Sequence, residues 1–232
     1  MSSSPSAAPL YELLYHPTIP GRGEYIRLAL EITHTPYTDV ANATHSGPTT
    51  VQSTISIPTH DASGNPPVFA PPALRVPNGG RNGAPLLLSQ TANILLYLGP
   101  RLGLVPADDE VGRLWVNQMT LTALDWSDEA HEVHHPVGSS LWYEEQVEEA
   151  KRRSEEVRRR RVPRFAGFFE GVLGEWGGGG SFWWGGLTYA DTTLWGWWMG
   201  SDMRFRRRWG FWRRVGSIRF CLGGFIRGLR RG

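Results

Sequence analysis

Residues 10–30 read Leu10-Tyr-Glu-Leu-Leu-Tyr15-His-Pro-Thr-Ile-Pro-Gly21-Arg-Gly-Glu-Tyr-Ile-Arg27-Leu-Ala-Leu. The apolar residues before Tyr15 are typical of a short buried strand, and the apolar spacing after Gly21 predicts a helix that begins near that glycine. This order places Tyr15 beside the first helical turn, where backbone N–H groups have no partner within the helix. The stretch therefore predicts a tyrosine hydroxyl at a position suited to binding an anion.

The composition indicates a globular protein. The chain has 232 residues and 40% hydrophobic content, enough to fill the cores of two small domains. Its first nine residues have neither the basic nor the apolar region of a secretion signal, and no run of about 18 apolar residues follows. The single cysteine, Cys221, excludes an internal disulfide framework and a Cys-X-X-Cys redox pair. We expect a cytoplasmic protein with no membrane partner and a disordered segment over residues 1–9.

The residues after the first helix predict a second strand, a long loop and a hairpin. Tyr37–Val40 has a strand pattern, whereas residues 41–71 are rich in Ser, Thr, Pro and Asn without helical periodicity, which predicts a loop. Two apolar runs, Ala73–Val76 and Pro85–Leu88, flank a segment of Pro, Asn and Gly residues. This arrangement indicates two antiparallel strands.

A further helix is expected to complete the first domain. Thr91 is the expected N-cap, followed by an apolar stripe at Ile94, Leu95 and Leu98. Gly99-Pro100 is expected to end the helix, because proline cannot continue the hydrogen-bond ladder. We place the domain boundary near residue 105, so that the first domain covers residues 10–104.

Residues 105–195 are expected to form an all-helical domain. The stretch 142–161 places acids four residues before arginines, a spacing that stabilises a helix by about 0.2–0.5 kcal/mol per pair. We interpret it as a solvated helix face. The four pairs are Glu148/Arg152, Glu149/Arg153, Glu155/Arg159 and Glu156/Arg160.

The last part of the chain, residues 196–232, has an atypical composition rich in Arg, Trp and Gly. Ten arginines and eight of the eleven tryptophans follow Glu175. One hypothesis is a shifted reading frame or misplaced splice junction, since these residue types share G-rich codons. The rival hypothesis is a basic, aromatic arm that binds nucleic acid or an anionic surface; we do not expect a nucleic-acid partner.

In the order and spacing of its motifs, the chain resembles the glutathione S-transferases, in particular the fungal-type, tyrosine-dependent members, over about residues 10–195. The motifs are the segment from Tyr15 to Arg27, the turn Pro72-Ala-Leu74, the helix start Ser89-Gln90-Thr91, and Leu187-Thr-Tyr-Ala-Asp191. The resemblance implies a thioredoxin-like α/β domain followed by an all-α domain. It also implies glutathione as co-substrate, a small hydrophobic electrophile as substrate, a homodimer, and a role in detoxification.

Tyr15 is the catalytic residue that the resemblance implies. A glutathione site must lower the pKa of a thiol from about 8.5, and two units of that change correspond to about 2.7 kcal/mol. A hydroxyl that donates a hydrogen bond to the thiolate supplies about 1.5–3 kcal/mol. Relatives that use serine or cysteine place it a few positions later, where this chain has Pro20 and Gly21.

The resemblance also implies residues that hold glutathione: Arg22, Pro71, Pro72, Gln90 and Thr91. Gln90 and Thr91 offer amide, hydroxyl and backbone N–H groups to the γ-glutamyl carboxylate at the positive end of a helix. A cis-proline is expected at Pro71 or Pro72. If it is Pro72, the preceding Pro71 has no N–H and can only accept from the cysteinyl unit; if it is Pro71, Ala70 can supply both bonds.

His131-Glu-Val-His134-His135 matches the H-E-x-x-H zinc pattern. Pro136 pushes His135 out of helical geometry, and no third ligand stands out beyond the surface-type residues Glu144, Glu145, Glu155 and Glu156, so we expect no metal. The resemblance instead implies an electrophile-binding cleft between the domains. Its candidate apolar wall is Trp115, Met119 and Trp126.

The sequence thus predicts a glutathione transferase that conjugates the thiolate to an electrophile. The alternative is a non-catalytic glutathione-transferase-like scaffold or binding protein, because a fold does not by itself confer function. Pro71 and the atypical tail favour this alternative.

Overall fold

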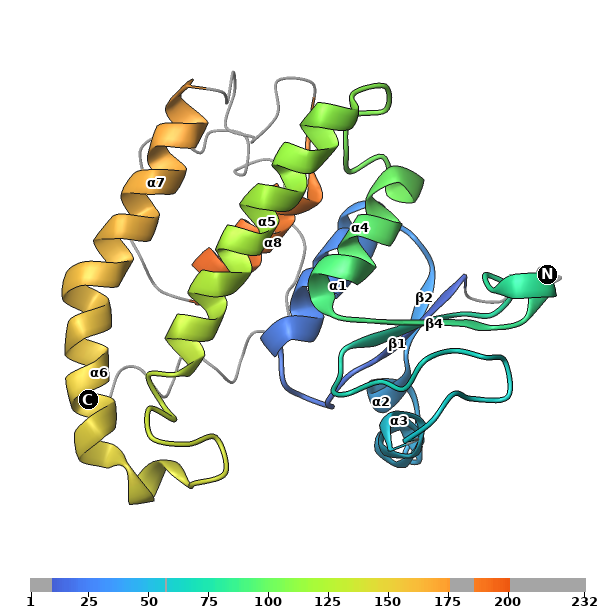
Figure 1. Cartoon of the computed structure of the whole chain (residues 1–232), viewed down its shortest axis with the longest axis horizontal. Helices are drawn as coiled ribbons and strands as arrows, with labels where there is room; N and C mark the ends of the chain where they lie inside the picture. Colours follow the sequence, from blue (N-terminus) through green and yellow to red (C-terminus); the bar gives the residue numbers. More distant parts are fainter. Residues whose placement is uncertain (1–9, 57, 176–185, 201–232) are drawn as a thin grey trace, which may run out of the picture. The chain divides into compact units, whose positions relative to one another are not determined.

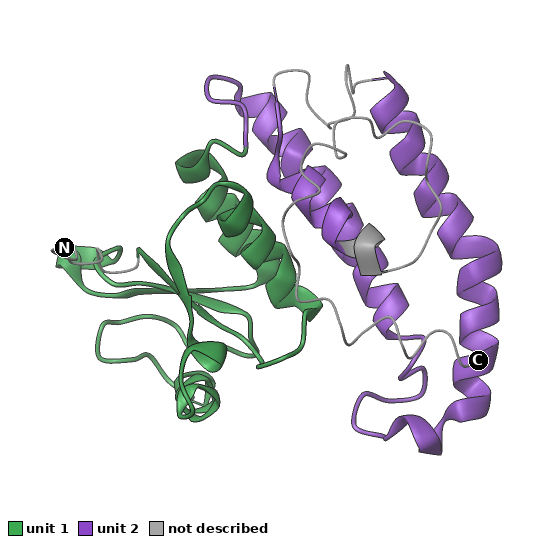
Figure 2. Cartoon of the chain, turned by 180° about the vertical axis from the view of Figure 1, so that it is seen from behind, with its two compact units in different colours: residues 1–104 green, residues 105–232 purple. Residues whose placement is uncertain are grey.

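The computed structural model describes residues 10–56, 58–175 and 186–200, without the side chains of residues 197–200. The expected disordered segment over residues 1–9 and the tail from residue 201 onward, including Cys221, lie outside these ranges, so both hypotheses about the tail stay predictions. The chain divides into two compact units, residues 1–104 and 105–232 (Figure 2).

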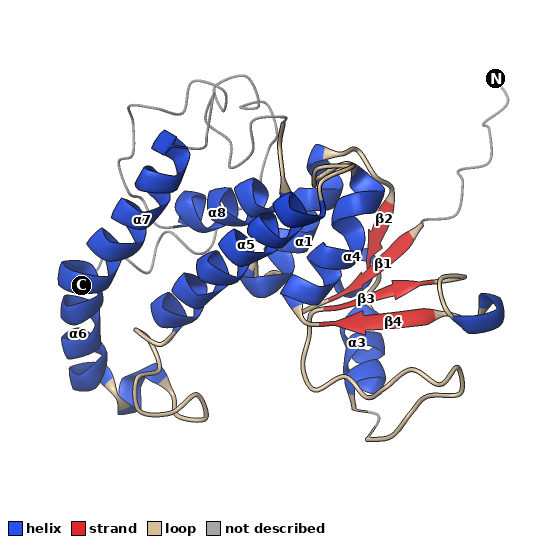
Figure 3. Ribbon diagram, turned by 45° about the horizontal axis from the view of Figure 1, so that its top comes forward, coloured by secondary structure: helices blue, strands red, loops and turns tan. Residues whose placement is uncertain are grey.

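Unit 1 contains a four-stranded sheet in the order β2-β1-β3-β4 (Figure 3). β1 and β2 pair in parallel, whereas β1–β3 and β3–β4 are antiparallel. This confirms the predicted strands and hairpin. The strands are β1 (Tyr11–Leu14), β2 (Tyr37–Asp39), β3 (Ala73–Val76) and β4 (Leu86–Ser89), with a 3-10 turn at Arg81–Gly83 between the last two.

Helices cover both faces of this sheet. Alternate strand residues such as Leu13 and Leu74 share one buried cluster with Ile26 and Leu30 of α1 (Gly21–Ile32) and with apolar residues of α4 (Thr91–Leu102). The opposite face packs Leu14 and neighbouring strand residues against Val51 of α3 (Gly47–Ile55) and Ala41 of α2 (Val40–Ala43). The period-two alternation of the strands thus supplies two cores.

Two expectations for unit 1 are wrong in detail. Residues 41–71 are not one long loop, because α2 and α3 form within them; α3 buries only Gly47 and Val51, too little to give a helical pattern. The helix predicted to end at Gly99-Pro100 continues through Pro100 to Leu102. It stops at Gly103, whose φ of 67° lies in the left-handed region that favours glycine.

In its described part, unit 2 contains helices, turns and a loop but no strand. Helices α5 (Glu110–His131) and α8 (Tyr189–Gly200) lie side by side (Figure 1). A second rod runs through α6 (Val147–Glu156), a π-helical turn at Val157–Arg161, and α7 (Val162–Glu175), after a 3-10 turn at Tyr143–Glu145. Together with unit 1, this confirms the predicted fold class. None of the helices in the described ranges combines the length and apolarity needed to cross a membrane.

The charged stretch of unit 2 forms fewer of the predicted contacts than expected. Of the four predicted pairs, only Glu155 and Arg159 are within ion-pair distance in the described structure, at 2.9 Å. Glu148 instead contacts Lys151, three residues away. These side chains are largely exposed, so their contribution to the free energy of unfolding is small.

The predicted capping box at the start of α8 is confirmed. The Asp191 carboxylate accepts from the Thr188 backbone N–H at 2.8 Å and from its hydroxyl at 2.6 Å. Both residues are almost fully buried. The box therefore satisfies polar groups that water cannot reach.

We predict that Asp191→Ala lowers the free energy of unfolding by about 2–4 kcal/mol, because it removes a cap and leaves buried Thr188 donors without an acceptor. Denaturant unfolding followed by circular dichroism measures the effect. The matched control is Asp108→Ala at an exposed position, where a change below about 0.5 kcal/mol is expected. Equal losses in the two variants would contradict a buried capping role.

Candidate functional site

Tyr15 directly follows β1, and its ring packs into the core that α1 and α4 cover. The residue is only 7% exposed, and Ile26 and Leu30 belong to the same cluster. Its hydroxyl oxygen accepts a hydrogen bond from the backbone N–H of Arg22 at 3.0 Å. The strand-end tyrosine and the first turn of α1 therefore meet as the sequence pattern predicts.

Two glycines make this close approach possible. A Cβ at Gly23 would lie 2.5 Å from the Tyr15 ring, and a Cβ at Gly21 would clash with the tyrosine hydroxyl. Gly21 also has a φ of 40°, which disfavours other residues. The segment Gly21-Arg-Gly23 thus lets the helix backbone lie directly against the tyrosine.

The surroundings of Tyr15 keep its hydroxyl protonated. Burial raises the pKa of Tyr15, and this effect outweighs the opposing influence of the Arg22 and Gly23 backbone N–H groups and of the Arg27 charge. Because the oxygen accepts from Arg22, the hydroxyl proton stays available for donation. No group among the described residues accepts that proton. The site therefore presents a neutral, oriented hydrogen-bond donor.

Arg27 contacts both the Tyr15 ring and the connection between β1 and α1. Its guanidinium lies 5.6 Å from the centre of the Tyr15 ring and contacts Asp39 at 2.7 Å and Glu24 at 3.1 Å. It also donates to the carbonyl of Ile19 in the connection between β1 and α1. The sequence analysis predicted neither ion pair of Arg27. The spacing of three residues between Glu24 and Arg27 is a local signal for the first pair, whereas the pair with Asp39 has no local signal.

Strand register brings three predicted site residues to one edge of the sheet. Leu14 of β1 lies opposite Ala73 of β3, which lies opposite Ser89 of β4. The residues immediately beyond this row are Tyr15, Pro72 and Gln90. The antiparallel pairing thus gathers residues from three distant parts of the sequence.

The start of α4 joins the start of α1 at this edge. The Thr91 hydroxyl donates to the carbonyl oxygen of Arg22 at 3.3 Å. The expectation that Thr91 is the N-cap is wrong: the N-cap position is Gln90, and Thr91 is the first helical residue. Gln90 is exposed and has a φ of 71°, a strained conformation for a residue other than glycine and one that is common at functional sites.

The proline pair precedes β3, as expected. The peptide bond between Pro71 and Pro72 is cis, so of the two alternatives the structure contains cis-Pro72. Pro72 is buried and Pro71 is half-buried. The backbone of Pro71 can accept a hydrogen bond through its carbonyl oxygen but cannot donate one, because proline nitrogen carries no hydrogen.

Comparison with known proteins identifies the architecture. Residues 131–206 match the family model for the glutathione S-transferase C-terminal domain. Prostaglandin synthase D of Nilaparvata lugens superposes with a TM-score of 0.58 at 23% identity, covering 81% of this chain and 79% of that one. The chain has the glutathione S-transferase fold.

Two glutathione transferases give the same result. The sigma-class glutathione S-transferase of Fasciola hepatica has a TM-score of 0.58 and 17% identity, with coverage of 88% and 83%. A glutathione transferase of Burkholderia graminis, solved with two glutathione molecules per subunit, has a TM-score of 0.53 and 24% identity, with coverage of 83% and 73%. A comparison with curated protein sequences finds no match.

The three residues predicted to line an electrophile-binding cleft, Trp115, Met119 and Trp126, all lie on α5 in unit 2. Met119 and Trp126 are buried and Trp115 is 39% exposed. The Trp126 ring stacks in parallel on Phe165 of α7, with ring centres 5.3 Å apart, and also on Phe169. Trp126 therefore joins α5 to α7, and the assignment of the three residues to an electrophile site stays a prediction.

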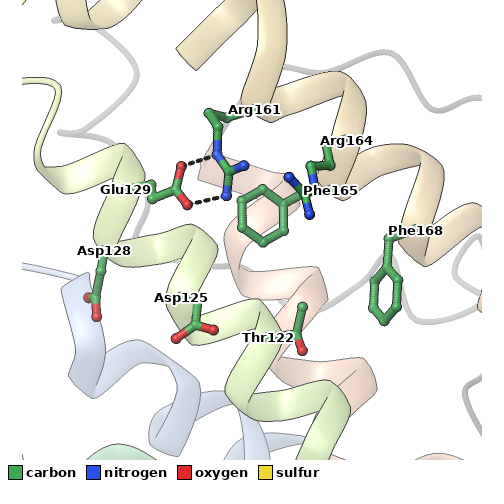
Figure 4. A pocket seen from close by; sticks show the side chains of 8 residues that line it. All are labelled: Thr122, Asp125, Asp128, Glu129, Arg161, Arg164, Phe165 and Phe168. Atoms are coloured by element: carbon green, nitrogen blue, oxygen red, sulfur yellow. Dashed lines mark hydrogen bonds and ion pairs between the residues drawn. The ribbon is translucent and has the colours of Figure 1, made fainter. Parts of the chain in front are cut away.

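A cavity of about 530 Å³ lies between α5 and α7 (Figure 4). Two of its lining residues, Arg161 and Glu129, are joined by two hydrogen bonds at 2.5 and 2.6 Å, and this contact lowers the pKa of Glu129. The remaining lining residues are Thr122, Asp125, Asp128, Arg164, Phe165 and Phe168. None of the catalytic, glutathione-binding or electrophile-binding residues predicted from the sequence lines this cavity.

The His131–His135 motif lies at the C-terminal end of α5. His131 is the last helical residue, and His135 follows a turn outside the helix, as Pro136 predicts. Among residues 10–56, 58–175 and 186–200, no group of three or more His, Cys, Asp or Glu side chains is arranged to hold a metal ion.

We predict that Gly23→Ala lowers the free energy of unfolding by about 1–3 kcal/mol, because the added Cβ displaces the Tyr15 ring. The matched control is Gly167→Ala on α7, where a Cβ meets open space. That change should raise the free energy of unfolding by about 0.5–1 kcal/mol, since alanine favours the helix. If Gly23→Ala is stabilising to the same degree, the ring does not lie against α1 as described.

Proposed function

We propose that the chain is a glutathione transferase that binds glutathione at the sheet edge of unit 1 and activates its thiol with Tyr15. The observation that carries the proposal is the Tyr15 hydroxyl, which accepts from the Arg22 N–H and keeps its own proton for donation. A hydroxyl held in this way stabilises a thiolate more than a thiol, because hydrogen bonds to charged groups are stronger.

The magnitude of this effect is sufficient for catalysis. Lowering a thiol pKa by two units from about 8.5 requires about 2.7 kcal/mol. One hydrogen bond to a charged atom supplies about 1.5–3 kcal/mol, and the partial positive charge at the N-terminus of α1 adds about 0.3–1 kcal/mol. The raised pKa of Tyr15 keeps the donor protonated at neutral pH. The thiolate then reacts with an electrophile held next to it.

The same edge offers groups for the rest of the tripeptide. We assign the γ-glutamyl carboxylate to Gln90 and to the backbone N–H groups at the start of α4, near Thr91. Arg22, half-buried on the first turn of α1, adds positive charge. The Pro71 carbonyl accepts from the cysteinyl N–H, while the reciprocal bond is absent.

We assign Trp115, Met119 and Trp126 to the electrophile, which is proposed to be small and hydrophobic. We further propose that the protein is a cytoplasmic homodimer with a role in detoxification and that its transferase reaction uses no metal cofactor. This part of the proposal rests on the motifs of the sequence and on the glutathione S-transferase fold. The fungal-type, tyrosine-dependent group is the proposed subfamily.

The second candidate function is a glutathione-transferase-like scaffold without catalysis. Pro71 favours it, because one backbone hydrogen bond to glutathione is lost. A protein that neither binds glutathione nor conjugates it to a chloronitrobenzene-type electrophile would support this candidate.

We predict that Tyr15→Phe lowers kcat/KM for glutathione conjugation about 10- to 100-fold, the equivalent of one hydrogen bond to a charged sulfur. The free energy of unfolding should change by less than about 1.5 kcal/mol, because the ring still fills its place. Tyr97→Phe, on α4, is the matched control and should retain wild-type activity. Wild-type kcat/KM in Tyr15→Phe removes Tyr15 from the mechanism.

We predict that Gln90→Ala weakens glutathione binding about tenfold, because it removes an amide that faces the γ-glutamyl carboxylate. Isothermal titration calorimetry with glutathione measures the change. Gln52→Ala, at an exposed position on α3, is the control and should leave Kd unchanged. Equal Kd values for Gln90→Ala and wild type would refute the assignment.

A further inference from the structure

Three histidines, His131, His134 and His135, lie at the C-terminal end of α5, and none of them is among the residues assigned to glutathione. The rings of His131 and His135 stack with their centres 5.4 Å apart and their planes inclined by 28°. The proposed transferase mechanism uses none of them.

The loop that follows these histidines is held by a buried glutamine. Gln146 is only 1% exposed. Its side-chain oxygen accepts from the backbone N–H groups of Val137 and Gly138, and its amide nitrogen donates to the carbonyls of Gly138 at 3.1 Å and Leu141 at 3.2 Å. The loop from residue 135 to residue 146 is thus fixed by side-chain hydrogen bonds.

His135 joins this network through Nδ1, which lies 3.3 Å from both the Leu141 carbonyl and the Gln146 amide nitrogen. A hydrogen bond to the carbonyl requires the tautomer with its proton on Nδ1, because a carbonyl oxygen only accepts. In that tautomer the other ring nitrogen, Nε2, keeps its lone pair. A backbone carbonyl that fixes one nitrogen in this way is the usual support of a metal-binding imidazole.

At this position the helix dipole favours a cation, whereas the nearby Glu132 carboxylate is already paired with Arg153. The last carbonyl groups of α5 carry the negative end of the helix dipole. Glu132 is the next residue along the chain and is exposed, with Arg153 at 3.0 Å. A metal–nitrogen bond is about 2.0–2.1 Å long, so two ligating nitrogens lie within about 4.2 Å of each other. In the structure the two ring centres are 5.4 Å apart, so binding one ion requires the exposed His131 side chain to rotate.

We propose that His131 and His135 bind one divalent transition-metal ion of the kind that prefers imidazole, such as Cu²⁺ or Zn²⁺. His135 is the fixed ligand and His131 the adjustable one. Water completes the coordination, since no third protein ligand is arranged around this pair in the described structure. The proposed metal site shares no residue with those assigned to glutathione, so its test does not require transferase activity.

The test is a calorimetric titration of the full-length protein with Zn²⁺ and, separately, Cu²⁺ at pH 7.5. We expect one equivalent to bind, with Cu²⁺ binding more tightly than Zn²⁺. His131→Ala and His135→Ala should each raise Kd at least tenfold. Retention of the wild-type Tm without metal establishes that each variant is folded.

Two matched controls separate this site from other ligands. His60→Ala, at an exposed position in the loop before β3, and Cys221→Ala should leave the first-equivalent Kd unchanged. The proposal is wrong if wild type binds neither ion below 1 mM, or if His131→Ala and His135→Ala bind as tightly as wild type. A loss of binding in Cys221→Ala alone would equally overturn it.

Discussion

The hydrogen bond from the Arg22 backbone N–H to the Tyr15 hydroxyl is the contact on which the site depends. The Arg22 nitrogen lies 3.0 Å from the Tyr15 hydroxyl oxygen, which accepts this bond. The hydroxyl proton therefore points away from the helix. This hydrogen bond requires the close approach that Gly21 and Gly23 permit. The Arg27 guanidinium, held by Asp39 and Glu24, fixes the connecting loop beside the same ring. Several local features thus serve one donor.

The sheet brings other proposed binding residues next to this local contact. Antiparallel pairing carries Pro72 and Gln90 to the positions next to Tyr15, although they are far apart in the sequence. The Thr91 hydroxyl then ties the first turn of α4 to the carbonyl of Arg22. Two helix N-termini, both positive, lie together at the edge to which we assign glutathione, a molecule with two carboxylates.

The features predicted from the sequence are those that local patterns encode. The Tyr15 segment, the hairpin and the Thr188/Asp191 box have short-range signals, and the structure confirms them. Helix α3 was missed because it buries too few residues to show a period. The Arg27–Asp39 pair and the Gln146 contacts join residues that only tertiary structure brings together, and the choice between Pro71 and Pro72 had no local signal either.

The account is tested most directly by the thiolate absorbance of bound glutathione as a function of pH, in the wild type and in Tyr15→Phe. The account predicts that the thiol of glutathione bound to the wild type titrates at least one pH unit below the value of about 8.5 for a free thiol. In Tyr15→Phe the midpoint should return toward that value. Identical midpoints in the two proteins would contradict the central claim that the oriented Tyr15 hydroxyl stabilises the thiolate.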